Sequence, residues 1–191
     1  MSRIIGGVAG SIRLAGAAPG TRPTSDRVKE SVFGALEAAD HISGARVLDL
    51  YAGTLALGLE ALSRGASDLV AIEKYRPALQ VCLENAAKVG SALNAAGSRP
   101  PMEIKLTDAM SYLAGTEKQF DLVFADPPYD LEPDQVTRLL SLVGRVISDD
   151  AVVVLEQAGS VTEIDLPNSL EFWSRRDYGD TSVWMFRASA Q

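Results

Sequence analysis

The stretch Asp126-Pro127-Pro128-Tyr129 follows an apolar run, Phe120 to Phe124, which predicts a buried strand. The Asp126 carboxylate and a neighbouring backbone carbonyl can both accept hydrogen bonds from one planar amino group, and the two prolines supply no competing N–H. Tyr129 offers a ring face on which a nucleobase can stack. These residue types in this order indicate a site that holds the amino group of a base. The alternative is an ordinary strand followed by a proline-rich turn.

A second candidate site begins at a strand over residues 47–51, which is apolar except for Asp49. The turn Ala52-Gly53-Thr54 follows it, and a helix is expected from about Leu55. Strand, glycine turn and helix form the first unit of a nucleotide-binding α/β fold. The next strand ends in Glu73, 20 residues after Gly53, and an acid there hydrogen-bonds ribose hydroxyls in such folds. Any parallel strand can end in a charged residue, but turn and acid together favour a ligand site.

Asp108 follows a third strand and could accept from the amino group of an adenine. It could equally cap a helix, or do both. The carboxyl ends of parallel strands share one edge of a sheet, and ligands bind beyond that edge. We therefore expect Asp49–Gly53, Glu73, Asp108 and Asp126–Tyr129 on one rim.

Strands alternate with helices along the chain, which predicts an α/β fold with a mostly parallel sheet and helices on both faces. Seven strands are expected, and the last two form an antiparallel pair around a turn at residues 178–181: 47–51, 69–72, 102–106, 120–124, 151–155, 172–175 and 182–186. Helices are expected from Thr24-Ser25-Asp26, from Leu55, from Arg76 to Val89 and from Glu132-Pro133, with a loop over residues 91–101.

The N-terminal residues differ from the rest in composition. Residues 3–15 predict a short hairpin and residues 16–23 a Gly/Pro linker, which divides the chain into a basic arm, 1–20, and a main domain, 21–191.

Charge is also unevenly distributed. Five cations and two anions give residues 1–30 a net charge of +3, against −7 for the chain, which leaves −10 for the remainder. The start of the first expected helix carries three cationic residues and a threonine: Arg22, Arg27, Lys29 and Thr24. Cations beside a helix N-terminus can bind a phosphate. A solvated first turn explains the same residues equally well.

Composition excludes several other classes. A single cysteine, Cys82, allows no internal disulfide and no cysteine cluster for zinc, and the lone His41 gives little support to a hydrolase triad. No apolar run approaches the ~18 residues of a membrane span, and the N-terminus lacks a signal-peptide core. We expect a cytoplasmic protein that uses no metal.

These motifs resemble Class I S-adenosylmethionine-dependent methyltransferases with a Rossmann-like fold, and more narrowly the RsmD family, over nearly the whole chain. The matching segment Thr21–Phe33 contains the family-specific part, the block from Arg22 to Phe33. The other matching segments are Arg3–Gly7, Val47–Gly53, Leu57–Ala66, Asp126–Tyr129 and Tyr178–Thr181. The resemblance implies methyl transfer to the N2 amino group of a guanine in 16S ribosomal RNA, within the small subunit or its assembly intermediate, by a monomer.

The resemblance also implies roles for individual residues. Asp126 and the Pro127 carbonyl would orient the guanine amino group, and Tyr129 would stack on the base. The implied cofactor-binding residues are Asp49, Tyr51, Ala52, Gly53, Glu73, Lys74, Asp108, Ala109 and Asp126. The implied RNA contacts are Arg3, Arg13, Arg22, Thr24, Arg27, Lys29, Pro128 and Tyr129.

One position departs from the family pattern, because Leu55 stands where a second glycine is usual. A leucine there is expected to narrow the site or to change the turn, and so to weaken cofactor binding. Three alternatives stay open: an adenine-N6 DNA methyltransferase, which shares the Asp-Pro-Pro-Tyr motif; a nicotinamide-dependent oxidoreductase, which leaves that motif unexplained; and a binding-only protein whose cofactor site Leu55 has impaired.

Overall fold

The computed structural model describes residues 2–18 and 25–189. Within these residues, seven strands form one sheet in the order β3-β2-β1-β4-β5-β7-β6. Their bounds are β1 Arg46–Leu50, β2 Asp68–Glu73, β3 Met102–Leu106, β4 Phe120–Ala125, β5 Ile147–Ala158, β6 Leu170–Tyr178 and β7 Thr181–Ala188. Strands β1 to β5 pair in parallel, and β7 lies antiparallel between β5 and β6. The predicted seven-stranded sheet with a C-terminal antiparallel pair is confirmed.

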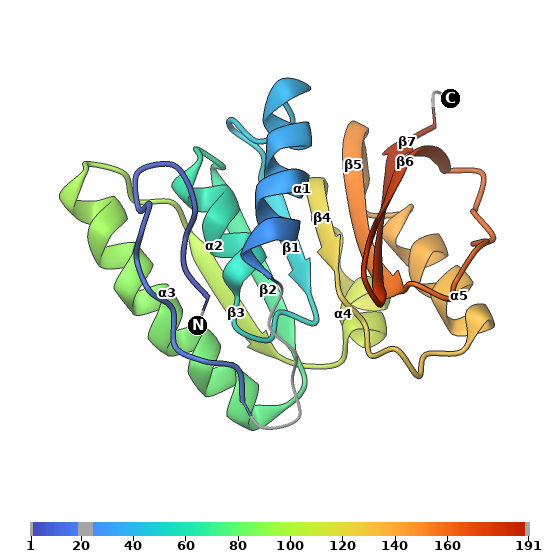
Figure 1. Ribbon diagram of the computed structural model, residues 1–191, viewed down its shortest axis with the longest axis horizontal. Helices are drawn as coiled ribbons and strands as arrows, with labels where there is room; N and C mark the ends of the chain where they lie inside the picture. Colours follow the sequence, from blue (N-terminus) through green and yellow to red (C-terminus); the bar gives the residue numbers. More distant parts are fainter. Residues whose placement is uncertain (1, 19–24, 190–191) are drawn as a thin grey trace.

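In the described part of the chain, five helices cover the two faces of the sheet: α1 Asp26–Ala38, α2 Ala56–Ser63, α3 Arg76–Ala95, α4 Ala109–Gly115 and α5 Pro133–Val143. Helices α1, α2 and α3 lie on one face and α4 and α5 on the other (Figure 1). Each face has its own apolar core. On the first, the rings of Phe33 and Phe124 lie 5.5 Å apart; on the second, Leu139 and Leu140 pack with Leu155.

Helices α1 and α4 begin at residues whose side chains cap them. The Ser25 side chain accepts from Val28 N at α1, and Asp108 accepts from Ser111 N at α4. Helix α3 continues to Ala95, so the predicted loop at 91–101 begins too early; residues 92–95 include good helix formers, and Leu93 is buried. Strand β5 is longer than predicted because it pairs with β7 as far as Ala158.

The predicted hairpin at residues 3–15 is reduced to one antiparallel bridge, between Arg3 and Arg13. The arm instead packs on the main domain, where Ile4, Ala9 and Leu14 join the core of the α1 face. Gly7 allows the close approach, since a Cβ there would lie 1.9 Å from the Ser63 carbonyl oxygen of α2. The boundary predicted at residues 20 and 21 lies outside the described residues.

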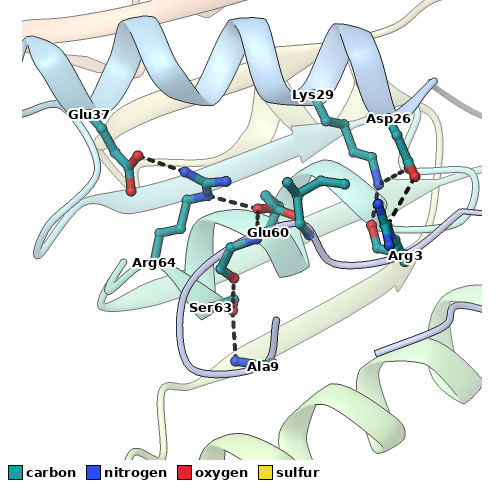
Figure 2. A network of polar contacts seen from close by, with 10 residues as sticks. Arg3, Ala9, Asp26, Lys29, Glu37, Glu60, Ser63 and Arg64 are labelled. Carbon is teal, nitrogen blue, oxygen red and sulfur yellow. Dashed lines mark hydrogen bonds and ion pairs between the residues drawn. The ribbon is translucent and has the colours of Figure 1, made fainter. Parts of the chain in front are cut away.

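The predicted RNA contact of Lys29 is wrong. Its side chain is fully buried, and its ammonium pairs with Asp26 at 3.1 Å and donates to the Arg3 carbonyl (Figure 2). The ammonium also donates to Ser2 Oγ at 2.9 Å. A buried ammonium needs such partners because it has lost its water. Lys29 therefore holds the arm against α1 and is not available to an RNA phosphate.

Candidate active site

The strand register brings the predicted site residues to one edge of the sheet. Leu50 at the end of β1 lies opposite Ile72 of β2 and Ala125 of β4, and Glu73 lies opposite Leu106 of β3. The segments that follow these strands therefore emerge side by side. Strand order reverses between β1 and β4, which is where ligands bind in doubly wound sheets.

The turn after β1 is built from left-handed backbone. Tyr51, Gly53 and Leu55 have φ angles of 61°, 56° and 64°. The Glu73 carboxylate holds this turn, because Oε2 accepts from Gly53 N at 2.9 Å while Oε1 accepts from Tyr75 N at 2.7 Å. Each carboxylate oxygen has capacity for a second hydrogen bond. Gly53 and Glu73, which are 20 residues apart in the sequence, are therefore in direct contact at the ends of β1 and β2.

Asp49 lies buried beneath the turn and accepts from Gly58 N at 2.9 Å. Burial raises the pKa of its carboxyl to about 7; the Gly58 hydrogen bond opposes this shift and the charge on Glu73 adds to it. Asp49 therefore titrates near neutral pH in the free protein.

This pKa predicts a pH dependence of stability. The folded carboxyl keeps its proton up to about pH 7, whereas its ordinary pKa is 3.8, so the folded state binds more protons between those values. The free energy of unfolding should fall as pH rises through this window, and Asp49→Asn should remove that component. Denaturant unfolding of both proteins from pH 4 to pH 8 would measure it; parallel profiles would contradict the assignment.

Cys82 has a role that the sequence did not suggest. Its buried thiol donates to the Gly53 carbonyl oxygen at 3.2 Å, from helix α3. Burial, followed by the charges on Asp49 and Glu73, raises the pKa of the thiol to about 12, which keeps it protonated as a donor. The contact joins positions 29 residues apart, so no local pattern could have shown it.

The Leu55 side chain is fully buried in the core of the α1 face. The expectation that it narrows the cofactor site is therefore wrong in this respect, because the side chain packs inward. Its backbone nevertheless occupies the left-handed region, which a branched residue adopts at a cost of about 1–2 kcal/mol.

Replacing Leu55 with glycine should therefore change stability more than cofactor affinity. Loss of a buried leucine side chain costs about 2–5 kcal/mol, and relief of the left-handed backbone offsets about 1–2 kcal/mol of this. We expect Leu55→Gly to unfold more easily than wild type, yet to be more stable than Leu55→Ala, which keeps the strain. Cofactor affinity should change less than about threefold; a gain above tenfold would show that Leu55 does shape the site.

Asp108 and Ala109 follow β3 on the same rim. The Asp108 carboxylate caps α4, accepting from Ser111 N at 3.0 Å, and Ala109 is buried behind it. Burial, and then the Asp108 charge, raises the pKa of the Tyr51 hydroxyl to about 12, so the ends of β1 and β3 share one electrostatic environment. Lys74 is exposed just beyond β2.

The Asp-Pro-Pro-Tyr loop follows β4 directly. Asp126 is partly buried and Pro127 buried, whereas Pro128 and Tyr129 are exposed. The Tyr129 hydroxyl lies 2.5 Å from Thr181 Oγ1 and donates to Glu156 Oε1 at 3.2 Å. Thr181 belongs to the Tyr178–Thr181 segment, so that segment, together with β5, fixes the aromatic ring beside Asp126.

The predicted RNA contacts are only partly described. Arg3, Arg13 and Arg27 are exposed, and Arg3 approaches Asp26 at 3.4 Å. Arg22 and Thr24 lie outside the described residues. Among residues 2–18 and 25–189, no group of His, Cys, Asp and Glu side chains could hold a metal ion, and no helix in those ranges is long and apolar enough to cross a membrane.

Comparison with known proteins identifies the family. A family model described as Conserved hypothetical protein 95 matches residues 2–187. Ribosomal RNA small subunit methyltransferase D of Escherichia coli K12 is 37% identical over 176 residues, which cover 91% of this chain and 82% of that protein. This chain belongs to the RsmD family.

Two further proteins extend the match of this RsmD-family chain. YlbH of Bacillus subtilis, described provisionally as an rRNA methyltransferase, is 31% identical over 189 residues, 98% of each protein. The solved structure of YhhF from Escherichia coli, described provisionally as a methyltransferase, superposes with a TM-score of 0.80 at 32% identity, over 100% of this chain and 99% of that one. The fold is thus the Rossmann-like α/β fold of methyltransferases.

Proposed function

We propose that this protein transfers a methyl group from S-adenosylmethionine to the exocyclic N2 amino group of a guanine in 16S ribosomal RNA. The observation that carries the proposal is the Asp126–Tyr129 loop, placed at the strand end beside the β1 turn in a chain whose relative in Escherichia coli is a small-subunit rRNA methyltransferase.

The residues at the rim suit S-adenosylmethionine. Among described residues, a Cβ built at Gly53 would have as neighbour only the Tyr51 carbonyl oxygen, at 3.8 Å, so the turn faces open space. The Asp49 carboxyl keeps its proton up to about pH 7 in the free protein, and a bound sulfonium or ammonium cation would favour its ionised form. The methionine end of the cofactor would be held by Asp49, Tyr51, Ala52 and Gly53. The ribose would be held by Glu73 and Lys74, and the adenine would lie near Asp108, Ala109 and Asp126. The bound cofactor supplies an activated methyl group.

Asp126 and Pro127 would orient the nucleophile. A guanine amino nitrogen is a weak nucleophile because its lone pair is delocalised into the ring. Hydrogen bonds from its two N–H groups to the Asp126 carboxylate and the Pro127 carbonyl localise that pair and aim it at the methyl group. These bonds strengthen as positive charge develops on nitrogen, so they stabilise the transition state more than the ground state. Tyr129, held through its hydroxyl, presents its ring to the base.

RNA would lie along the basic N-terminal arm, with Arg3, Arg13 and Arg27 near phosphates together with Arg22 and Thr24. Pro128 and Tyr129 are exposed where they can touch the target nucleotide. We further propose that the protein acts as a cytoplasmic monomer, with a basic arm at 1–20 and the methyltransferase domain at 21–191, on the small subunit or its assembly intermediate.

Acceptor preference tests this proposal. Radiolabelled S-adenosylmethionine is offered with unmodified small subunits, naked 16S rRNA or duplex DNA. We expect label in the ribosomal acceptors and none in DNA. Label in DNA alone would support methyl transfer from S-adenosylmethionine but would contradict a ribosomal substrate. Cofactor binding without transfer to any acceptor would support a binding-only protein.

A further inference from the structure

The side chain of Asn85, on helix α3, joins two segments that are far apart in the sequence. Its Oδ1 atom accepts from the Ala15 amide of the N-terminal arm at 2.7 Å, and its Nδ2 atom donates to the Thr54 carbonyl of the turn after β1 at 2.9 Å. Asn85 is fully buried, so its amide depends on these partners in place of water. One side chain therefore connects the arm to the turn at which the cofactor is proposed to bind.

The two partners fix the direction in which the Asn85 amide faces. A backbone N–H only donates and a backbone carbonyl only accepts, so Ala15 requires the oxygen of the amide and Thr54 requires its nitrogen. The contact with the arm therefore sets the orientation in which Asn85 holds the turn.

The turn after β1 needs such support because its backbone is strained. Tyr51 and Leu55 lie in the left-handed region, with φ angles of 61° and 64°, although neither is glycine. Residues in such conformations keep them only where the surrounding structure determines them. The contacts around the turn are thus part of what gives it its shape.

Hydrogen bonds hold the turn from two sides. Glu73 of β2 accepts from Gly53 N at 2.9 Å. From α3, Cys82 donates to the Gly53 carbonyl oxygen at 3.2 Å, and Asn85 donates to the carbonyl of the next residue, Thr54. Cys82 and Asn85 are three residues apart on one helix, which places them on the same face. Among these contacts, that of Asn85 also reaches the arm.

We infer that Asn85 is a positioning residue for the cofactor: by holding the Thr54 carbonyl, it keeps the turn after β1 in the conformation that binds S-adenosylmethionine. The inference rests on the proposed function, because it takes the ligand of this turn to be S-adenosylmethionine. Its consequence is that seating of the arm and binding of the cofactor are linked through one side chain, and such a link acts equally in both directions.

The variant Asn85→Ala removes this link, and Ser63→Ala is its matched control. Ser63 is also buried; its hydroxyl accepts from Ala9 N at 2.9 Å and donates to the Gly6 carbonyl at 2.6 Å (Figure 2). Each variant therefore deprives one amide and one carbonyl of their partner, and both should melt at a lower temperature than wild type. The difference is that both partners of Ser63 belong to the arm, whereas Asn85 also holds the turn.

Cofactor binding distinguishes the two variants. Calorimetric titration with S-adenosylhomocysteine, well below the melting temperature of each protein, should give Asn85→Ala a Kd about five- to tenfold above wild type, the effect of one hydrogen bond. Ser63→Ala should stay within about twofold of wild type. KM for S-adenosylmethionine should follow Kd, with kcat at saturating cofactor unchanged. Equal Kd values for the two variants would overturn the inference.

A second test uses wild-type protein, so it does not depend on a variant that folds. Amide hydrogen exchange is followed by NMR with and without saturating S-adenosylhomocysteine. Because the link is reciprocal, the ligand should slow exchange of the Ala15 amide by the same factor of about five to ten, while the Ala9 amide, held by Ser63, should change less than about twofold. Equal slowing of both amides, or none at Ala15, would contradict the role given to Asn85.

Neither binding measurement requires methyl transfer. A protein that gives both expected results but methylates no RNA would overturn the proposed function alone. Normal methylation of RNA, together with a wild-type Kd for Asn85→Ala, would overturn the inference alone.

Discussion

Replacing Asp126 with alanine should lower kcat for methyl transfer by about 10²–10³-fold, the usual loss when one preorganised group that stabilises transition-state charge is removed. In the proposed mechanism the Asp126 side chain is one of two acceptors for the guanine amino group, and the Pro127 carbonyl alone would not orient both N–H groups. Because Asp126 lies in a loop and is only partly buried, the fold should survive. Single-turnover transfer with preformed enzyme–cofactor complex would measure the effect.

Two matched variants distinguish orientation of the amino group by Asp126 from the effect of local negative charge. Asp126→Asn keeps a carbonyl acceptor in the same place and should retain part of the activity, whereas Asp130→Ala removes an exposed carboxylate four residues away and should have no effect on kcat. Equal losses in all three variants would mean that the local negative charge matters and that orientation of the amino group by Asp126 does not.

Replacing Glu60 with alanine should lower the free energy of unfolding by about 3–5 kcal/mol, the cost of removing one partner from a buried ion pair. The fully buried Glu60 carboxylate accepts from Ile5 N at 2.6 Å, from Gly6 N at 2.8 Å and from Arg64 Nε at 2.7 Å (Figure 2). Its loss leaves the amide groups of Ile5 and Gly6 and the Nε atom of Arg64 without their acceptor. Denaturant unfolding measures the change.

The same network contains its own control. Glu37 pairs with Arg64 Nη1 at 2.7 Å, but its side chain is 51% exposed, and exposed pairs contribute about 0–1 kcal/mol. Glu37→Ala should therefore be nearly neutral. Equal losses for Glu37→Ala and Glu60→Ala would show that Glu60 does not anchor the arm. With the arm detached, RNA affinity should fall as well, because Arg3 and Arg13 lose their fixed position.

The strand ends were predictable because their signals are local. An apolar run that ends at Asp126, a turn at Gly53 and an acid at Glu73 each predict a strand terminus, and parallel topology brings them to one edge. Helix starts at Ser25 and Glu132 followed from capping residues and Pro133. These features need only neighbouring residues, so the fold and the position of the rim could be anticipated.

The contacts that hold the site were not predictable, because they join distant positions. The lysine at position 29 reads as a surface cation until the arm folds over it. Likewise, the hydroxyl of Tyr129 meets Thr181 across 52 residues. Leu55 occupies the position of a usual glycine, and only the packing of α2 shows that its side chain is buried in the core. The sequence pattern predicts that the candidate site residues lie at the carboxyl edge of the sheet. Tertiary packing determines which of their side chains are accessible there.

The central claim is that this rim delivers the N2 amino group of a guanine to S-adenosylmethionine. It is tested most directly by separating the nucleosides of small subunits that wild-type protein and Asp126→Ala have methylated. Label in N2-methylguanosine with wild type, and its loss with Asp126→Ala, is the predicted result. Label in any other nucleoside, or N2-methylguanosine formed at the wild-type rate by Asp126→Ala, would contradict the account.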